Sequence, residues 1–210
     1  MIAGGKMDFI ERIARRMVLI KKLIGLFAFL ALSAAPLMAQ NYPRFDFSVG
    51  GSMRSFQQSE TAKGITIGMP GWYGAIDYNF HRFRNHFALE LQAAGNYRDQ
   101  GYFGRTTVST YLIGPKIYPL GHHKLTPYGH VLFGGAYTRN DVPPVGGAQS
   151  TIQSSASNAW ETGLGMDWNI KKHWGVRLLE FDYGQTRFFQ YKTIQTNYVA
   201  SIGINYRFGR

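Results

Sequence analysis

Residues 196–208, TNYVASIGINYRF, alternate between two kinds of side chain. From Tyr198 onward the even positions are apolar or aromatic and end in Tyr206 and Phe208, whereas the odd positions are mostly small or polar. Side chains point alternately to the two faces of a β-strand, so this period of two predicts a strand with one apolar face. A soluble sheet could show the same pattern, so the rest of the chain must decide its environment.

Seven earlier segments show the same alternation, and turn-forming residues separate them. The eight expected strands cover residues 44–52, 71–79, 87–98, 106–118, 125–138, 158–169, 173–183 and 196–208. The connectors after the second, fourth and sixth strands are short, and three of the other four are long. The polar stretch 149–158 reads as part of a flexible outer loop. The pattern predicts an all-β fold with antiparallel neighbours.

The seventh expected strand breaks the alternation. Arg177 falls on the opposite face from Glu180 and Asp182 if the strand is regular. A β-bulge near Leu178–Leu179 would place all three on one face, and bulges are common in barrels.

Residues 1–39 have the layout of a secretory signal peptide: basic residues, an apolar run at 23–32, then small residues. Cleavage is expected after Ala39, which leaves residues 40–210 as one barrel domain. The basic stretch is long enough for translation to begin at Met7 or Met17. A retained N-terminal anchor helix is the alternative, although the apolar run is shorter than the roughly 20 residues that span a bilayer.

Composition excludes several classes of protein. The formal charge of +11 falls to +7 without residues 1–39, and the remaining basic residues are scattered. A nucleic-acid-binding protein would show a basic stripe within a recognisable module. The chain has no cysteine, and its 25 glycines, 13 tyrosines and 15 phenylalanines are typical of a β-barrel.

Export and alternation together predict a barrel in a membrane. An open sheet in lipid would leave edge amides without hydrogen bonds, whereas a closed barrel pairs them all. Eight strands give an interior that side chains fill. We therefore expect an eight-stranded antiparallel up-and-down transmembrane β-barrel, monomeric, with outer-membrane lipid and lipopolysaccharide around it.

The whole pattern resembles the small outer-membrane β-barrel family of the OmpA/OmpX type, without the OmpA periplasmic domain. The residues Ser201, Gly203, Tyr206 and Phe208 resemble the C-terminal assembly signal of such barrels. In that family the barrel-assembly machinery reads this strand, and periplasmic chaperones act during biogenesis. Here Gly209 and Arg210 follow the final aromatic residue, which departs from the usual ending.

The resemblance also implies an interior ion-pair cluster. Its members here are Glu90, Lys116, Glu161 and Arg177. Unpaired buried charges are costly, so such groups must pair. The cluster is either a purely structural network or a gate that opens when partners exchange. Asp167 or Asp182 could take the place of Glu161.

No catalytic, cofactor or metal site is expected. Some small outer-membrane barrels modify lipid A with a His and a nearby Ser. His130 is the best single candidate, but the position two residues on is Leu132, so the match fails. We expect His130 to be an interior or girdle residue.

The function predicted is a structural or surface-interaction role in the outer membrane, with a narrow gated pore as an extension. The alternatives are a transporter of a small solute, a lipid A-modifying enzyme and a soluble exported barrel of lipocalin type. In the last of these the apolar faces would point inward and the four charged residues would lie on the surface. The loop residues Arg187, Phe188, Phe189, Tyr191 and Lys192 are candidates for surface binding.

Overall fold

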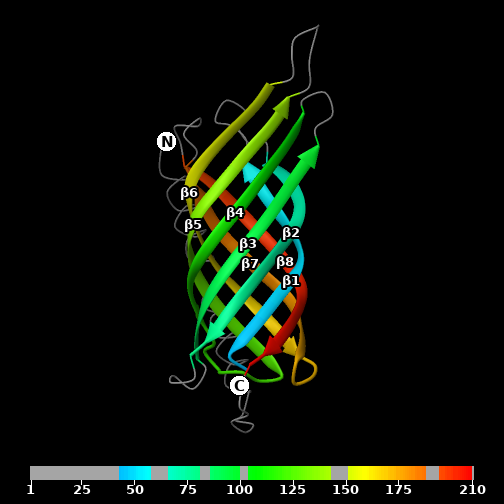
Figure 1. Cartoon of the computed structure of the whole chain (residues 1–210), viewed down its shortest axis with the longest axis vertical. Helices are drawn as coiled ribbons and strands as arrows, with labels where there is room; N and C mark the ends of the chain where they lie inside the picture. Colours follow the sequence, from blue (N-terminus) through cyan, green and yellow to red (C-terminus); the bar gives the residue numbers. More distant parts are fainter. Residues whose placement is uncertain are drawn as a thin grey trace, which may run out of the picture. The chain divides into compact units, whose positions relative to one another are not determined.

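The computed structural model describes residues 43–57, 66–80, 86–99, 104–142, 151–187 and 194–209. They form eight antiparallel strands that close into one barrel in chain order, with β1 pairing both β2 and β8 (Figure 1). The strands are β1 (Phe45–Gln57), β2 (Thr66–Asn79), β3 (Phe87–Asp99), β4 (Arg105–Ile117), β5 (Leu125–Val142), β6 (Thr151–Asn169), β7 (Trp174–Thr186) and β8 (Gln195–Phe208). The predicted fold class is confirmed.

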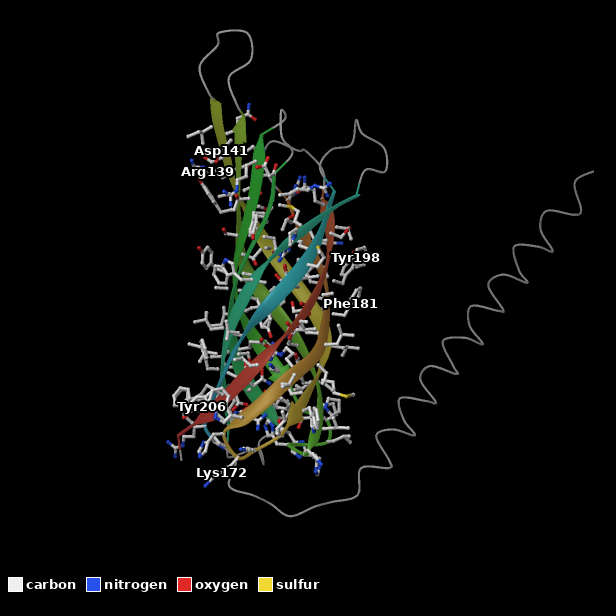
Figure 2. All side chains as sticks on the ribbon, turned by 90° about the vertical axis from the view of Figure 1, so that its right-hand side faces the viewer. Arg139, Asp141, Lys172, Phe181, Tyr198 and Tyr206 are labelled. Atoms are coloured by element: carbon white, nitrogen blue, oxygen red, sulfur yellow. The ribbon has the colours of Figure 1, made fainter. Side chains whose placement is uncertain are left out.

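The alternation is inverted relative to a soluble barrel. Large apolar side chains such as Leu91, Ile113 and Phe133 are about half exposed on the outer wall, while Glu90 and Lys116 are fully buried inside. Figure 2 shows Phe181, Tyr198 and Tyr206 projecting outward from the wall. An apolar outer wall around a polar interior suits hydrocarbon. The lipocalin-type alternative is therefore wrong, because it needs the opposite orientation.

The β-bulge predicted in β7 is confirmed. Arg177 pairs with Gly203 and Glu180 pairs with Ser201, so two residues of β7 oppose one residue of β8. The two extra side chains, Leu178 and Leu179, both face outward and are 41% and 54% exposed. Arg177, Glu180 and Asp182 consequently all face the interior.

The loop between β5 and β6 is shorter than the sequence predicts, because β5 continues to Val142 and β6 begins at Thr151. These strands have 18 and 19 residues against 13 or 14 in the others, and they extend past their neighbours at the top of Figure 1. Residues 151–158 were assigned to a flexible loop because they lack an apolar face. A hairpin that has left the membrane needs no such face, so the alternation disappears although the strand continues.

Some predictions lie outside the described residues. They include the signal peptide 1–39 and the loop residues Phe188, Phe189, Tyr191 and Lys192. Within the described ranges, no helix is long and apolar enough to cross a membrane.

Candidate functional site

The candidate site is the barrel interior, because most of the buried polar side chains gather there. Period-two alternation turns every second residue of each strand inward. In the described ranges, the inward positions carry seven buried carboxylates, four buried lysine or arginine side chains and one buried histidine. Opposite charges are thereby brought together from strands that are distant in sequence.

A first group centres on Lys116 of β4. Its Nζ lies 2.8 Å from Asp77 Oδ2 and 3.4 Å from Glu90 Oε2. The ammonium also stands over the ring of Tyr128, 4.1 Å from the centroid. Since Lys116 is completely buried, these contacts replace its hydration shell.

A second group centres on Arg177 of β7. Its guanidinium contacts Glu180 Oε2 at 2.8 Å and Asp167 Oδ1 at 3.2 Å. The Tyr128 hydroxyl donates a hydrogen bond of 2.6 Å to Glu180 Oε2. The Arg177 guanidinium lies 4.9 Å from the Tyr128 ring centroid, so this tyrosine contacts both groups and joins them.

His130 of β5 connects the carboxylates of two other strands. Its Nδ1 lies 2.8 Å from Glu90 Oε2 on β3, and its Nε2 lies 2.9 Å from Asp182 Oδ1 on β7. The histidine is therefore an interior residue, one of the two positions predicted for it. Both ring nitrogens face carboxylates, and Leu132 beside it is fully buried, so this is not a serine–histidine pair.

A third group lies nearer the end of the barrel that carries the long hairpin. Arg54 donates hydrogen bonds to Glu161 Oε1 at 2.9 Å and to Asn96 Oδ1 at 3.1 Å. Beside it, apolar side chains pack together inside the barrel. They are Met69, Val108, Leu112, Leu132, Ala136 and Ala159. Salt bridges and apolar packing thus fill the lumen at this level.

The four residues of the predicted cluster all face inward, but the structure does not join them into one group. Glu90 and Lys116 are in contact, whereas Glu161 pairs with Arg54 and Arg177 pairs with Glu180 and Asp167. The predicted first strand ends at residue 52, so the predicted cluster does not include Arg54. Arg54 continues the inward parity of Ser48 and Ser52, which was the available signal.

The turns at the end of the barrel opposite the long hairpin are basic. Lys124, Lys171 and Lys172 are exposed there, and Figure 2 shows Lys172 at the lower rim. His122 is different: burial together with nearby cations, Arg207 foremost, holds its pKa well below the ordinary value. The basic residues His81, Arg82 and Arg84 of the β2–β3 turn lie outside the described residues.

Comparison with known proteins agrees with this architecture. A family model described as outer membrane protein beta-barrel domain matches residues 26–208. Neisserial surface protein A is similar in structure, with a TM-score of 0.62 at 10% identity over 80% of this chain and 100% of its own. Ail of Yersinia pestis gives a TM-score of 0.55 at 15% identity, covering 80% and 99% of the two chains.

OprG of Pseudomonas aeruginosa gives a TM-score of 0.51 at 16% identity over 80% of this chain and 97% of its own. At these identities the similarity concerns the fold alone. No curated protein matches the chain in sequence.

Proposed function

Because the chain belongs to the outer membrane protein β-barrel domain family, we propose that it is a closed barrel that binds extended polypeptide segments at the cell surface. The observation that carries this proposal is an unpaired strand edge. Pairing of β6 with β7 starts at Ala159 and Thr186, so among the described residues 151–158 form a backbone ladder with β5 alone. On the β7 side, the Arg187 N–H donates a hydrogen bond of 2.7 Å to the Ser157 hydroxyl. An edge of this kind offers backbone donors and acceptors to an incoming strand.

The edge lacks the usual protection against pairing. Natural edges carry charged residues, proline or bulges, but residues 151–158 read TIQSSASN and contain none of the first two. The β5–β6 ladder is in register over this stretch, from Val142 and Thr151 to Gly135 and Asn158. Residues 151–158 of β6 extend beyond the part that pairs with β7, whereas β5 stays paired with β4 as far as Asp141.

The barrel below the hairpin fits a supporting role. Buried salt bridges and the apolar group around Leu112 and Leu132 pack inside the barrel, which favours a supporting scaffold over an open channel. β1 begins and β8 ends at the end of the barrel that carries the short basic turns, and in outer-membrane barrels short turns face the periplasm. The hairpin then points outward. The similarly folded Ail is named an attachment invasion locus protein, and attachment is a role of the kind proposed here.

The test is binding of a chemically unfolded model polypeptide to the barrel in lipid nanodiscs, measured by biolayer interferometry. We expect saturable binding to the native barrel. A variant in which an Asn-Gly turn replaces residues 140–157 should lose it, and Ser154→Lys should weaken it by placing charge on the edge. Equal binding by all three barrels, or none by any, would refute the surface-interaction proposal.

A narrow gated pore is a second candidate, favoured by the charged lumen. Lys116 has two carboxylate partners within 3.4 Å, so it could exchange one for the other. Planar bilayer recording tests this. Discrete openings that Lys116→Met abolishes would support gating, while a silent bilayer containing correctly folded barrel would exclude it.

Export and assembly complete the proposal. Residues 1–39 would be removed as a signal peptide, which an intact mass beginning at Gln40 would verify. In β8, Tyr206 and Phe208 face outward and Ser201 inward, so the expected assembly signal presents its aromatics to the membrane side. Phe208→Ala should slow assembly by the barrel-assembly machinery in cells, whereas Ile204→Ala on the same face should not.

A further inference from the structure

Among the residues that the structure describes, the lumen holds more negative than positive charge. The buried carboxylates are those of Asp46, Asp77, Glu90, Glu161, Asp167, Glu180 and Asp182. The buried lysine and arginine side chains are Arg54, Lys116, Arg177 and Arg207. Three of the seven carboxylates therefore have no lysine or arginine to match them. A surplus of one sign is unfavourable in a narrow interior with little water, so bound protons or a further cation must offset it.

The surplus is concentrated around His130. One potential ligand atom from each of Glu90, His130 and Glu180 lies within 4.8 Å of the others, and all three residues are buried. They come from β3, β5 and β7, so barrel closure assembles them. Glu90 Oε1 and Asp182 Oδ2 have no hydrogen-bond partner in the described part of the chain, although both residues are at most 1% exposed.

The contacts of His130 also require a proton or a metal ion between the two acceptors. An imidazole nitrogen without a proton and a carboxylate oxygen are both acceptors, so they approach to 2.8 Å only with a positive centre between them. That centre is either a proton or a metal ion. On the other side of the ring, Nε2 lies 2.9 Å from Asp182 Oδ1. A carboxylate on the second nitrogen is how proteins orient a metal-binding histidine.

We propose that the barrel interior binds one divalent transition-metal ion of the zinc, nickel or cobalt class, with Glu90, Glu180 and Nδ1 of His130 as ligands. Asp182 would hold the Nε2 proton. One nitrogen and two oxygen donors suit these borderline ions better than Ca²⁺ or Mg²⁺, which prefer oxygen alone. Binding displaces the proton that His130 and Glu90 would otherwise share.

The neighbouring cations leave room for this ion. Lys116 is closer to Asp77, at 2.8 Å, than to Glu90, at 3.4 Å, so it keeps a partner when Glu90 turns to the metal. Glu180 gives Oε2 to Arg177 and Tyr128, and its Oε1 has only a 3.5 Å contact with Gln92 Nε2. Each ligand residue thus has an oxygen or nitrogen available without breaking the arginine pair.

The local charge favours the metal over a proton. Five carboxylates surround this part of the lumen: Asp77, Glu90, Asp167, Glu180 and Asp182. Against Lys116, Arg177 and a protonated His130 they leave a net charge of −2. With a divalent ion and a neutral His130 the net charge is −1, which is closer to balance.

The site is enclosed, so the ion must enter before the barrel closes. The experiment therefore refolds untagged mature barrel from metal-free urea into detergent micelles, with Co²⁺ or Zn²⁺ added before refolding and a chelator wash afterwards. Metal retained per chain is measured by plasma mass spectrometry, and visible absorption reports Co²⁺ coordination. The gel shift between unboiled and boiled samples confirms folding of every variant.

We expect about one metal ion per folded native chain, and at least tenfold less in Glu90→Gln and His130→Asn. His173→Asn, which changes an exposed turn histidine, should retain the native stoichiometry and serves as the control. If a ligand variant fails to fold, the cobalt spectrum of the native barrel decides: coordination by one nitrogen and carboxylate oxygens supports the site. Native barrel that folds and retains no metal would overturn the proposal and assign the balance of charge to protons.

Discussion

Gly163→Ala should destabilise the barrel far more than an ordinary glycine substitution in a strand. Gly163 lies on β6 opposite His130 of β5 and Asp182 of β7. A Cβ built at this position would lie 1.7 Å from Asp182 Oδ1 and 2.7 Å from His130 Nε2. Real Cβ atoms do not approach so closely, so the His130–Asp182 contact must break or the strands must shift.

The expected loss of stability in Gly163→Ala has two contributions. Overpacking a filled interior costs about 1–3 kcal/mol. Losing a hydrogen bond to a charged group costs about 1.5–3 kcal/mol more when Asp182 is pushed away. We therefore expect a loss of about 3–5 kcal/mol. Gly74→Ala is the matched control, because its Cβ would meet only Ser48 O at 3.8 Å, an ordinary contact.

The assay is reversible urea unfolding from lipid vesicles, followed by the fluorescence of the four tryptophans, with a chelator present. The background Asp182→Ala identifies the cause, because removing the carboxylate should remove most of the Gly163→Ala penalty. Gly163→Ala as stable as Gly74→Ala would refute the packing described here. An unchanged penalty in the Asp182→Ala background would show that the clash lies elsewhere.

Three further outcomes follow from burial and register. Lys116→Met should cost about 3–5 kcal/mol in the same unfolding assay, because it leaves two buried carboxylates without their cation. Leu91→Lys on the lipid-facing wall should lower the free energy of unfolding by about 2–4 kcal/mol, whereas Ile152→Lys on the hairpin should leave it unchanged. The two native side chains are similarly exposed, at 53% and 60%, so the difference would come from the lipid around Leu91. Deletion of Leu178 should still give a heat-modifiable barrel, because it removes the bulge and keeps Arg177 and Glu180 inside. Deletion of Leu91 from the regular strand β3 should not.

The sequence predicted the wall of the barrel well, because lipid imposes a rule on each residue separately. Every outward side chain within the membrane must be apolar, so the period of two is regular except at the bulge, where the neighbours Leu178 and Leu179 both face outward and are both apolar. The rule ends where the membrane ends. The ends of β5 and β6 carry no alternation for that reason, and the hairpin was assigned to a loop.

The pairing inside the lumen could not be predicted in the same way. The alternation along each strand places Glu161 and Arg177 inside the barrel. It does not say at which level of the barrel each residue lies or which strand faces it across the lumen. Those depend on the register of all eight strands, in which an error of one residue changes every partner. Parity alone therefore leaves the partner of Glu161 open, and in the structure that partner is Arg54.

A rule visible only after the registers are known links the inward glycines to the large polar side chains. Gly165 lies opposite Tyr128, Gly184 opposite Glu161, and Gly163 opposite Asp182. At each of these glycines an added Cβ would lie within 2.7 Å of the opposing side chain. A lumen of eight strands is too narrow for two large side chains at one rung, so a glycine on one strand gives space to a charge or ring on the next. The glycines of β6 and β7 thus determine where the polar network can exist, and a barrel without them would have to exclude His130 or Asp182 from its centre.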